Sequence, residues 1–137
     1  MLEIKPIQTK EEQKEICGVC GVEFSPDCLA YGAKENGVFD FDRTSFVAGV
    51  SQFRILGKYA VIYDLANAVG IDDLEVLILM GKAMLNFVDL CGVKDVIIKT
   101  ENIQNKNLIK ILGFKEDNSG VYKLNLKDYF DSPCQKD

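Results

Sequence analysis

The chain has 137 residues, which is enough for one domain with a sizeable core. Hydrophobic residues make up 47% of it and charged residues 27%, the balance of an ordinary globular protein rather than of a disordered or membrane-spanning one. The net charge of -5 and the lack of a Lys and Arg cluster argue against nucleic acid or an anionic membrane as a partner.

Five cysteines and the lack of histidine limit the chemistry of the chain. No basic segment followed by an apolar run marks an export signal, so we expect a cytoplasmic protein with reduced thiols. Cys17 and Cys20 have the spacing of a zinc knuckle, but a structural zinc site needs four ligands and the sequence has no second such pair. We therefore predict no metal, and we expect the pair to face the core rather than to act in redox chemistry.

The first half of the chain predicts a strand, a helix and a three-stranded meander. Residues 2–7 alternate as a strand does, and Thr9 with Glu12 forms a capping box for a helix from Lys10 to about Cys20. Three further strands are predicted at 28–34, 46–56 and 59–69, with an Asn-Gly turn at 36–37 and a polar insertion at 38–45.

The second half predicts a βαβ unit. The strand from Tyr59 leads into a long apolar helix from Asp72 to about Cys91, and a further strand follows at 94–99. This order places the two strands parallel in one sheet with the helix on its face. A short helix ending at Leu112 and a strand at 121–126 complete the predicted α/β fold, an α+β mixed sheet of about seven strands with helices on both faces.

We assign residues 1–131 to a single domain and residues 132–137 to a flexible tail, with Tyr129 and Phe130 packing back onto the domain.

The long helix is apolar on more than its sheet-facing side. A second stripe follows the first at helical spacing and consists of Val76, Leu79, Met80, Ala83, Phe87 and Leu90. We expect the first helix and the C-terminal segment to cover this second stripe. The alternatives are a homodimer contact and an apolar ligand groove.

Two local motifs and the order of the elements resemble one family. Residues 102–114 read Asn-Ile-Gln-Asn-Lys-Asn-Leu-Ile-Lys-Ile-Leu-Gly-Phe, and the long helix contains Gly81-Lys-Ala-Met-Leu85 and leads to Gly92-Val93. Over nearly the whole chain, the pattern resembles the GNAT superfamily of acyl-CoA-dependent N-acyltransferases. The resemblance implies a GNAT fold, acetyl-CoA or CoA as cofactor, and acyl transfer to an amine of a small molecule or peptide.

The resemblance also implies where the cofactor would lie. The family binds the CoA pyrophosphate with an Arg/Gln-x-x-Gly-x-Gly/Ala loop before the main helix, and residues 76–81 hold this place with only Gly81 matching. The acyl-pantetheine arm would follow the strand backbone through Leu65, Asn67 and Val69, where the Asn67 side chain could also contact it.

The second motif implies the remaining contacts. Asn102 is its retained polar residue, whereas Ile109 stands where the family has a general-acid tyrosine. A water or another tyrosine, such as Tyr63 or Tyr122, would then substitute for the general acid. Asp64 on the fourth strand and Glu101 after the fifth are candidate general bases, because both would lie near the sheet opening where the family binds its amine. The alternative is that they are ordinary solvated or capping carboxylates.

The start of the long helix predicts weak CoA binding. Asp72 is a good N-cap, and Glu75 three residues later can complete a capping box. With Asp73 they place three carboxylates where the pyrophosphate would bind, and no Lys or Arg lies between Tyr59 and Gly81. We predict that CoA binds weakly or not at all.

Two functions stay open from the sequence. The first is a divergent N-acetyltransferase that transfers an acyl group to an unknown amine. The second is a GNAT-like domain that has lost catalysis and serves as a binding or dimerisation module.

Overall fold

The computed structural model describes residues 2–36, 45–99, 101, 103 and 105–130. In chain order its elements are β1 (Leu2–Pro6), α1 (Lys10–Cys20), β2 (Leu29–Asn36), β3 (Ser45–Leu56), β4 (Tyr59–Asn67), α2 (Leu74–Leu90), β5 (Asp95–Ile98), α3 (Lys106–Leu112), β6 (Lys115–Glu116) and β7 (Tyr122–Asn125). The predicted Asn-Gly turn, the polar insertion and the tail at 132–137 lie wholly or mainly outside the described residues.

The strands form one mixed sheet in the order β1-β2-β3-β4-β5-β7-β6. Every neighbouring pair is antiparallel except β4 and β5, which run parallel because α2 carries the chain back along the sheet. The predicted βαβ unit and the mixed α/β sheet of about seven strands are therefore confirmed.

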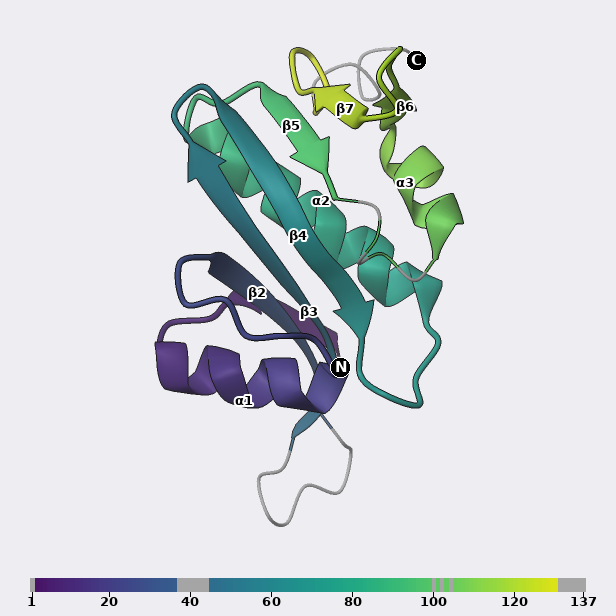
Figure 1. Ribbon diagram of the computed structural model, residues 1–137. Helices are drawn as coiled ribbons and strands as arrows, with labels where there is room; N and C mark the ends of the chain where they lie inside the picture. Colours follow the sequence, from purple (N-terminus) through teal and green to yellow (C-terminus); the bar gives the residue numbers. More distant parts are fainter. Residues whose placement is uncertain (1, 37–44, 100, 102, 104, 131–137) are drawn as a thin grey trace.

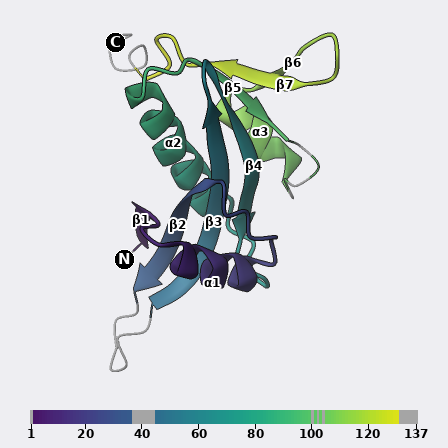
Figure 2. The same cartoon turned by 60° about the vertical axis from the view of Figure 1, so that its left-hand side comes forward.

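Helices cover both faces of this sheet. Figure 1 shows α1 in front of the strands and α2 behind them, and Figure 2 shows α2 running alongside the long strands β3 and β4. The larger core lies on the α2 face and includes Leu65, Met80 and Leu112, whereas the smaller core lies under α1 and includes Ile16 and Cys17. Each face of β4 therefore meets a different helix.

Helix α1 begins and ends as its sequence predicts. The Thr9 hydroxyl accepts a hydrogen bond from the Glu12 backbone N–H at 3.1 Å, which satisfies one of the free donors of the first turn. Gly21 ends the helix with a positive φ of 68°, a conformation that glycine adopts without strain. Cys17 and Cys20 are buried, so the prediction that they face the core is confirmed.

The second stripe of α2 packs differently from the prediction. Helix α1 lies on the opposite face of the sheet, so the expectation that it covers α2 is wrong. Instead Val76 and Met80 are buried in the larger core, and the Phe87 ring packs against the rings of Tyr31 and Phe53 at 6.3 and 6.0 Å. Leu79 and Leu90 stay exposed.

The C-terminal segment packs back onto the domain, as predicted. Tyr129 and Phe130 contact the larger core, and the Tyr129 hydroxyl donates a 2.6 Å hydrogen bond to the Leu112 carbonyl at the end of α3. No described helix is long and apolar enough to cross a bilayer.

Candidate functional site

Among the described residues, no strand pairs with one side of the end of β4. It pairs with β5 only from Tyr59 to Ile62, where β5 ends opposite at Ile98, and it continues to Asn67 beside β3 alone. Figure 1 shows β4 running on past the tip of β5. The Ala68 N–H bonds to the Ala48 carbonyl on β3, so by alternation the backbone groups of Asn67 and Leu65 point to the open side.

A β-bulge decides which side chains of β4 reach which face. Phe53 of β3 lies opposite Ile62 and Gln52 lies opposite Asp64, so β4 has one residue more than β3 between these pairs, namely Tyr63. Ile62 faces the α2 core before the bulge, and regular alternation would place Asp64 there too. The extra residue turns Asp64 to the α1 face, next to Gln52.

Gln52 is the centre of a buried hydrogen-bond network that holds Asp64. Its Nε2 donates to Asp64 Oδ2 at 2.8 Å and to the Glu23 carbonyl at 2.9 Å. Its Oε1 accepts from Gln13 Nε2 at 2.8 Å and from the Ser25 N–H at 3.0 Å. One strand side chain thereby fixes both the carboxyl group and the loop that follows α1.

Asp64 borders a pocket of about 380 Å³ between β4 and this loop. The lining residues are Gly21, Val22, Glu23, Ser25, Tyr63, Asp64 and Ala66. Burial raises the pKa of the Asp64 carboxyl, the Gln52 hydrogen bond opposes the rise, and the Glu23 carboxylate adds to it. Asp64 forms no ion pair with a Lys or Arg among the described residues, so the pocket favours a positively charged ligand.

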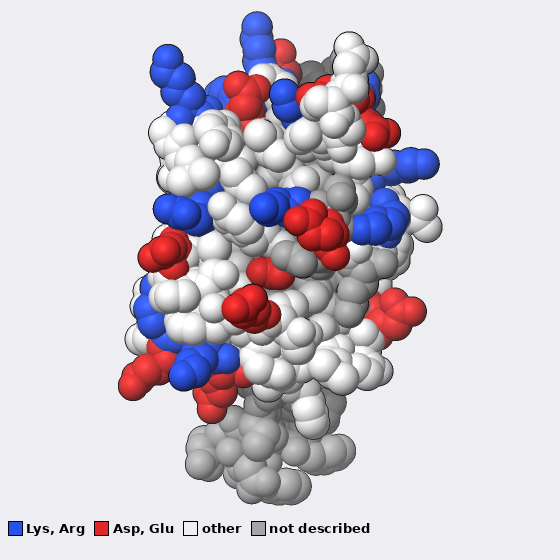
Figure 3. All heavy atoms as spheres, viewed as in Figure 1, with Lys and Arg blue, Asp and Glu red and all other residues white. Residues whose placement is uncertain are grey.

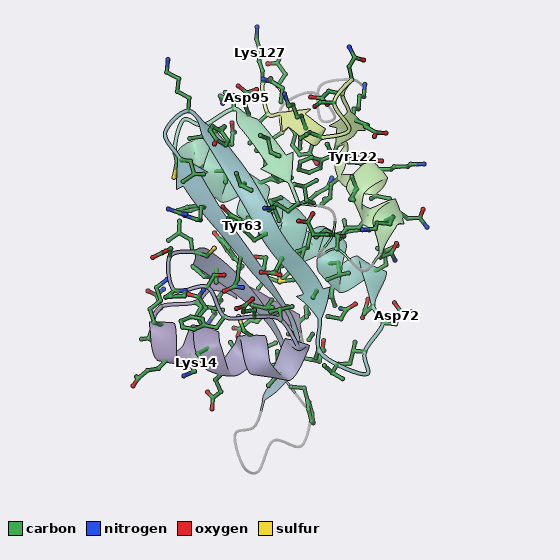
Figure 4. The ribbon with its side chains drawn as sticks, in the orientation of Figure 1. Lys14, Tyr63, Asp72, Asp95, Tyr122 and Lys127 are labelled. Carbon is green, nitrogen blue, oxygen red and sulfur yellow. The ribbon has the colours of Figure 1, made fainter. Side chains whose placement is uncertain are left out.

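Charges of both signs meet where β4 separates from β5. Figure 3 shows acidic side chains over the middle of β4 with basic side chains beside them, and Figure 4 places Tyr63 over the same part of the strand. The Lys99 ammonium lies over the Tyr63 ring, 5.7 Å from its centroid. Tyr63 therefore has Asp64 as its neighbour in the pocket and a cation across its ring. Tyr122 lies on β7, opposite Ile98.

On the other face of β4, Asn67 joins the strand to the start of α2. Its Nδ2 donates to the carbonyls of Ala48 and Asp73, each at 3.2 Å, and its Oδ1 accepts from the Asp73 N–H at 3.0 Å. The side chain predicted to contact the cofactor is thus buried and engaged in positioning α2.

Helix α2 begins as a capped helix. Asp73 is the N-cap and accepts a hydrogen bond from the Val76 N–H at 3.3 Å, so the assignment of the cap to Asp72 is wrong by one residue. The reason is that Asn67 holds the Asp73 backbone and thereby sets where the helix starts. Asp72, Asp73 and Glu75 are exposed there, and Figure 4 shows Asp72 in the loop beyond the end of β4.

Gly81 lies inside α2, two turns after the helix begins. A Cβ at this position would lie 2.9 Å from Leu112 Cδ1, so the missing side chain lets α2 approach α3 closely. Residues 76–80, which align with the family's phosphate loop, are helical. The glycine of the predicted pyrophosphate loop therefore serves helix packing in this structure.

The other predicted site residues lie at or beyond the open edge. Val69 is exposed, and its N–H donates to the Val19 carbonyl at 3.1 Å. Leu65 has its side chain in the α2 core, so only its backbone can meet a ligand. Glu101 is exposed after β5 and does not line the Asp64 pocket, and Asn102 lies outside the described residues.

A groove of about 440 Å³ lies between the starts of α2 and α3, where the implied CoA would bind. Its lining residues are Asn67, Ile71, Asp72, Leu77, Asn105, Lys106 and Asn107. The open backbone edge of β4 fits the pantetheine arm of CoA. The start of α2 fits the pyrophosphate poorly, because Asp73 takes the Val76 N–H and the exposed carboxylates of Asp72, Asp73 and Glu75 lie in or next to the first turn. Asp72 and Lys106 both line the groove, so its one lysine faces a carboxylate there.

Three buried cysteines lie near the site but offer no reactive thiolate. Burial raises the pKa of Cys17 to about 11 and that of Cys20 to about 12. Within the described part of the chain, no group of three or more His, Cys, Asp or Glu side chains could hold a metal ion.

Sequence reasoning missed Glu23, Gln52 and Lys99. A polar Gln52 between Val50 and Phe53 in a strand is a usable signal, because an amide on a largely apolar strand needs partners. The contact of Lys99 with Tyr63 joins two strands and has no local sequence signature.

No protein-family model and no curated protein sequence matches the chain, but solved structures do. Ribosomal-protein-S18-alanine N-acetyltransferase from Escherichia coli aligns with 14% identity and a TM-score of 0.62 over 90% of this chain and 89% of that one. PaiA N-acetyltransferase from Thermoplasma acidophilum, in complex with coenzyme A, aligns with 13% identity and a TM-score of 0.65 over 91% and 99%.

IAA acetyltransferase from Bacillus cereus aligns with 16% identity and a TM-score of 0.63, over 86% of this chain and 79% of that one. Structural similarity at such low sequence identity establishes the arrangement of helices and strands. It does not establish the activity, which has to be argued from the residues of this chain. The chain has the fold of the GNAT N-acetyltransferases.

Proposed function

We propose that this chain is a divergent N-acyltransferase that takes a primary amine in the Asp64 pocket. The observation that carries the proposal is the buried Asp64 carboxyl, which is held by Gln52, borders a pocket and lies beside the open edge of β4. A carboxylate in this place can hold an ammonium group and then accept its proton.

Each part of the site has a defined task in this reaction. Asp64 takes a proton from the bound ammonium group, so that the neutral nitrogen can form the new C–N bond. The backbone groups of Leu65 and Asn67 orient an extended acyl chain along β4. A CoA thioester, when bound, would supply the activated acyl carbon, and its sulfur would leave as the thiol. Tyr63, which lines the pocket, would give its hydroxyl proton to the departing sulfur and regain a proton from the nitrogen as the amide forms.

The donor would be held by its pantetheine arm more than by its pyrophosphate. Because carboxylates surround the start of α2, we expect acetyl-CoA to bind with a dissociation constant near or above 1 mM. At 1 mM ligand this stabilises the fold by only about 0.4 kcal/mol, so the melting temperature should hardly change. A dissociation constant in the micromolar range, measured by calorimetry, would contradict this view of the helix start.

A second function has its own support. The capped start of α2 and the buried Ile109, where the family has its acid, favour a module that binds an amine without acylating it. The two functions differ in product formation and share the amine pocket.

The deciding experiment combines product detection with amine binding. The protein is incubated with 1 mM acetyl-CoA and a panel of primary amines, and products are detected by mass spectrometry together with release of free thiol. The acyltransferase predicts acetylated amine and a rate about 100-fold lower for Asp64→Asn. Amine binding without product would establish the binding module, and an unchanged rate in Asp64→Asn would exclude Asp64 as the base.

A further inference from the structure

A cation lies over an aromatic ring that also lines the amine pocket. Asp64 and Tyr63 are consecutive residues that line the same pocket, and the Lys99 ammonium lies 5.7 Å from the Tyr63 ring centroid. Lys99 comes from the end of β5, so the bulge at Tyr63 and the separation of the two strands bring it there. The site therefore has a negative side and a positive side.

Lys99 is available to a ligand. The side chain is exposed, and among the ion pairs of the described residues it takes part in none. Its described contact is with the face of Tyr63, which orients the ammonium without neutralising it. Glu23, an exposed carboxylate that lines the pocket, lies close enough to Asp64 to raise its pKa, so the negative charge is concentrated in the pocket itself, which Lys99 does not line.

We infer that the acceptor is a primary amine that also carries a carboxylate, with its ammonium group at Asp64 and Glu23 and its carboxylate at Lys99. A simple alkylamine would leave Lys99 without a counter-charge, and a diamine would bring a second ammonium group against it. A zwitterion matches both sides. This inference rests on the proposed amine pocket and adds the chemical class of the amine.

The test uses three probes with the same four-carbon chain: 4-aminobutyrate, butylamine and 1,4-diaminobutane. Binding to the full chain is measured by NMR titration at neutral pH. A second series with six carbons covers a longer span between the two charges. We expect the amino acid to bind about fivefold more tightly than the alkylamine, which is the effect of one exposed charge pair.

Variants separate the inference from the function on which it rests. Lys99→Met should reduce the ratio of the amino acid to the alkylamine affinity to about one, and Lys99→Glu should make the diamine the best probe. Lys127→Met is the matched control, because Lys127 is exposed at the far end of the sheet (Figure 4), and it should keep the wild-type ratio. Unliganded melting curves check that each variant folds.

The outcomes are distinguishable. If all three probes of both series bind equally and Asp64→Asn abolishes their binding, the amine pocket stands and the zwitterion inference is overturned. If the diamine binds best to the wild type, the inference is also overturned. If no probe binds, both the pocket and the inference fail.

Discussion

The two faces of β4 hold their polar side chains in opposite ways. On the α2 face, Asn67 is neutral, buried and bonded to Ala48 and Asp73 through both ends of its amide. On the α1 face, Asp64 is a buried carboxyl whose described partner is the neutral amide of Gln52. The first arrangement stabilises the fold, whereas the second leaves a charge that a ligand can satisfy. This difference is the reason that we propose a binding site on the α1 face of β4 and a structural role for Asn67 on the α2 face.

Removal of the Gln52 side chain should have the largest effect. Gln52→Ala takes away four hydrogen bonds in a fully buried place and leaves Asp64 without its donor. We expect a loss of about 3 kcal/mol in the free energy of unfolding, measured by urea denaturation. Gln8→Ala is the matched control, because Gln8 is exposed, and it should change stability by less than about 0.5 kcal/mol. Equal free energies of unfolding for Gln52→Ala and Gln8→Ala would show that the buried network around Asp64 does not hold the α1 face together.

On the other face of β4, Asn67→Ala should lower the free energy of unfolding by about 2 kcal/mol. The variant leaves the buried Ala48 carbonyl without the amide donor and releases the backbone of the α2 cap. Asn86, exposed on α2, provides the control, and Asn86→Ala should be neutral or slightly stabilising because alanine favours the helix. If Asn67→Ala keeps wild-type stability but loses acetyl-CoA binding, its amide serves the ligand rather than the fold.

The smallest expected change in stability is an increase, for Asp64→Asn. Asp64→Asn removes a carboxyl whose pKa burial raises, and the Asn oxygen can still accept from Gln52. The folded state holds the Asp64 proton more tightly than the unfolded state does, so the ionised group lowers stability above its raised pKa and has no such effect below about pH 3.9. Asp64→Asn should therefore raise the melting temperature by a few degrees at neutral pH and leave it unchanged at pH 3. A lower melting temperature at neutral pH would show that the carboxylate stabilises the fold.

The fold is predictable from the sequence because its signals are local. Thr9 and Glu12 start α1, Gly21 ends it, and the apolar run after Asp73 can only be a crossover helix between two strands of one sheet. The predicted start of α2 differs from the observed one by one residue, because it is set by the hydrogen bond from the Asp73 N–H to the Asn67 side chain on another element.

The site is predictable only in part. Asp64 is identifiable as a carboxyl on a strand near the sheet opening, but its face is decided by the extra residue at Tyr63, which alternation alone does not reveal. Gln52 and Lys99 act through contacts between strands that are distant in sequence. Gly81 is predicted to contact the cofactor because it matches a family position, but in the structure the missing side chain allows α2 to pack closely against α3.

The bulge at Tyr63 also makes the face that each later side chain of β4 reaches depend on the number of residues before it. Every side chain from Asp64 to Ala68 reaches its present face because one residue more lies on β4 than on β3 between the paired positions. Deletion of a single residue there, with every other residue unchanged, would carry the carboxyl into the apolar core and bring Leu65 to the pocket. The number of residues before Asp64 thus determines which face its carboxyl reaches. In a related chain without the extra residue, an aspartate aligned with Asp64 would face the other helix and could not line this pocket.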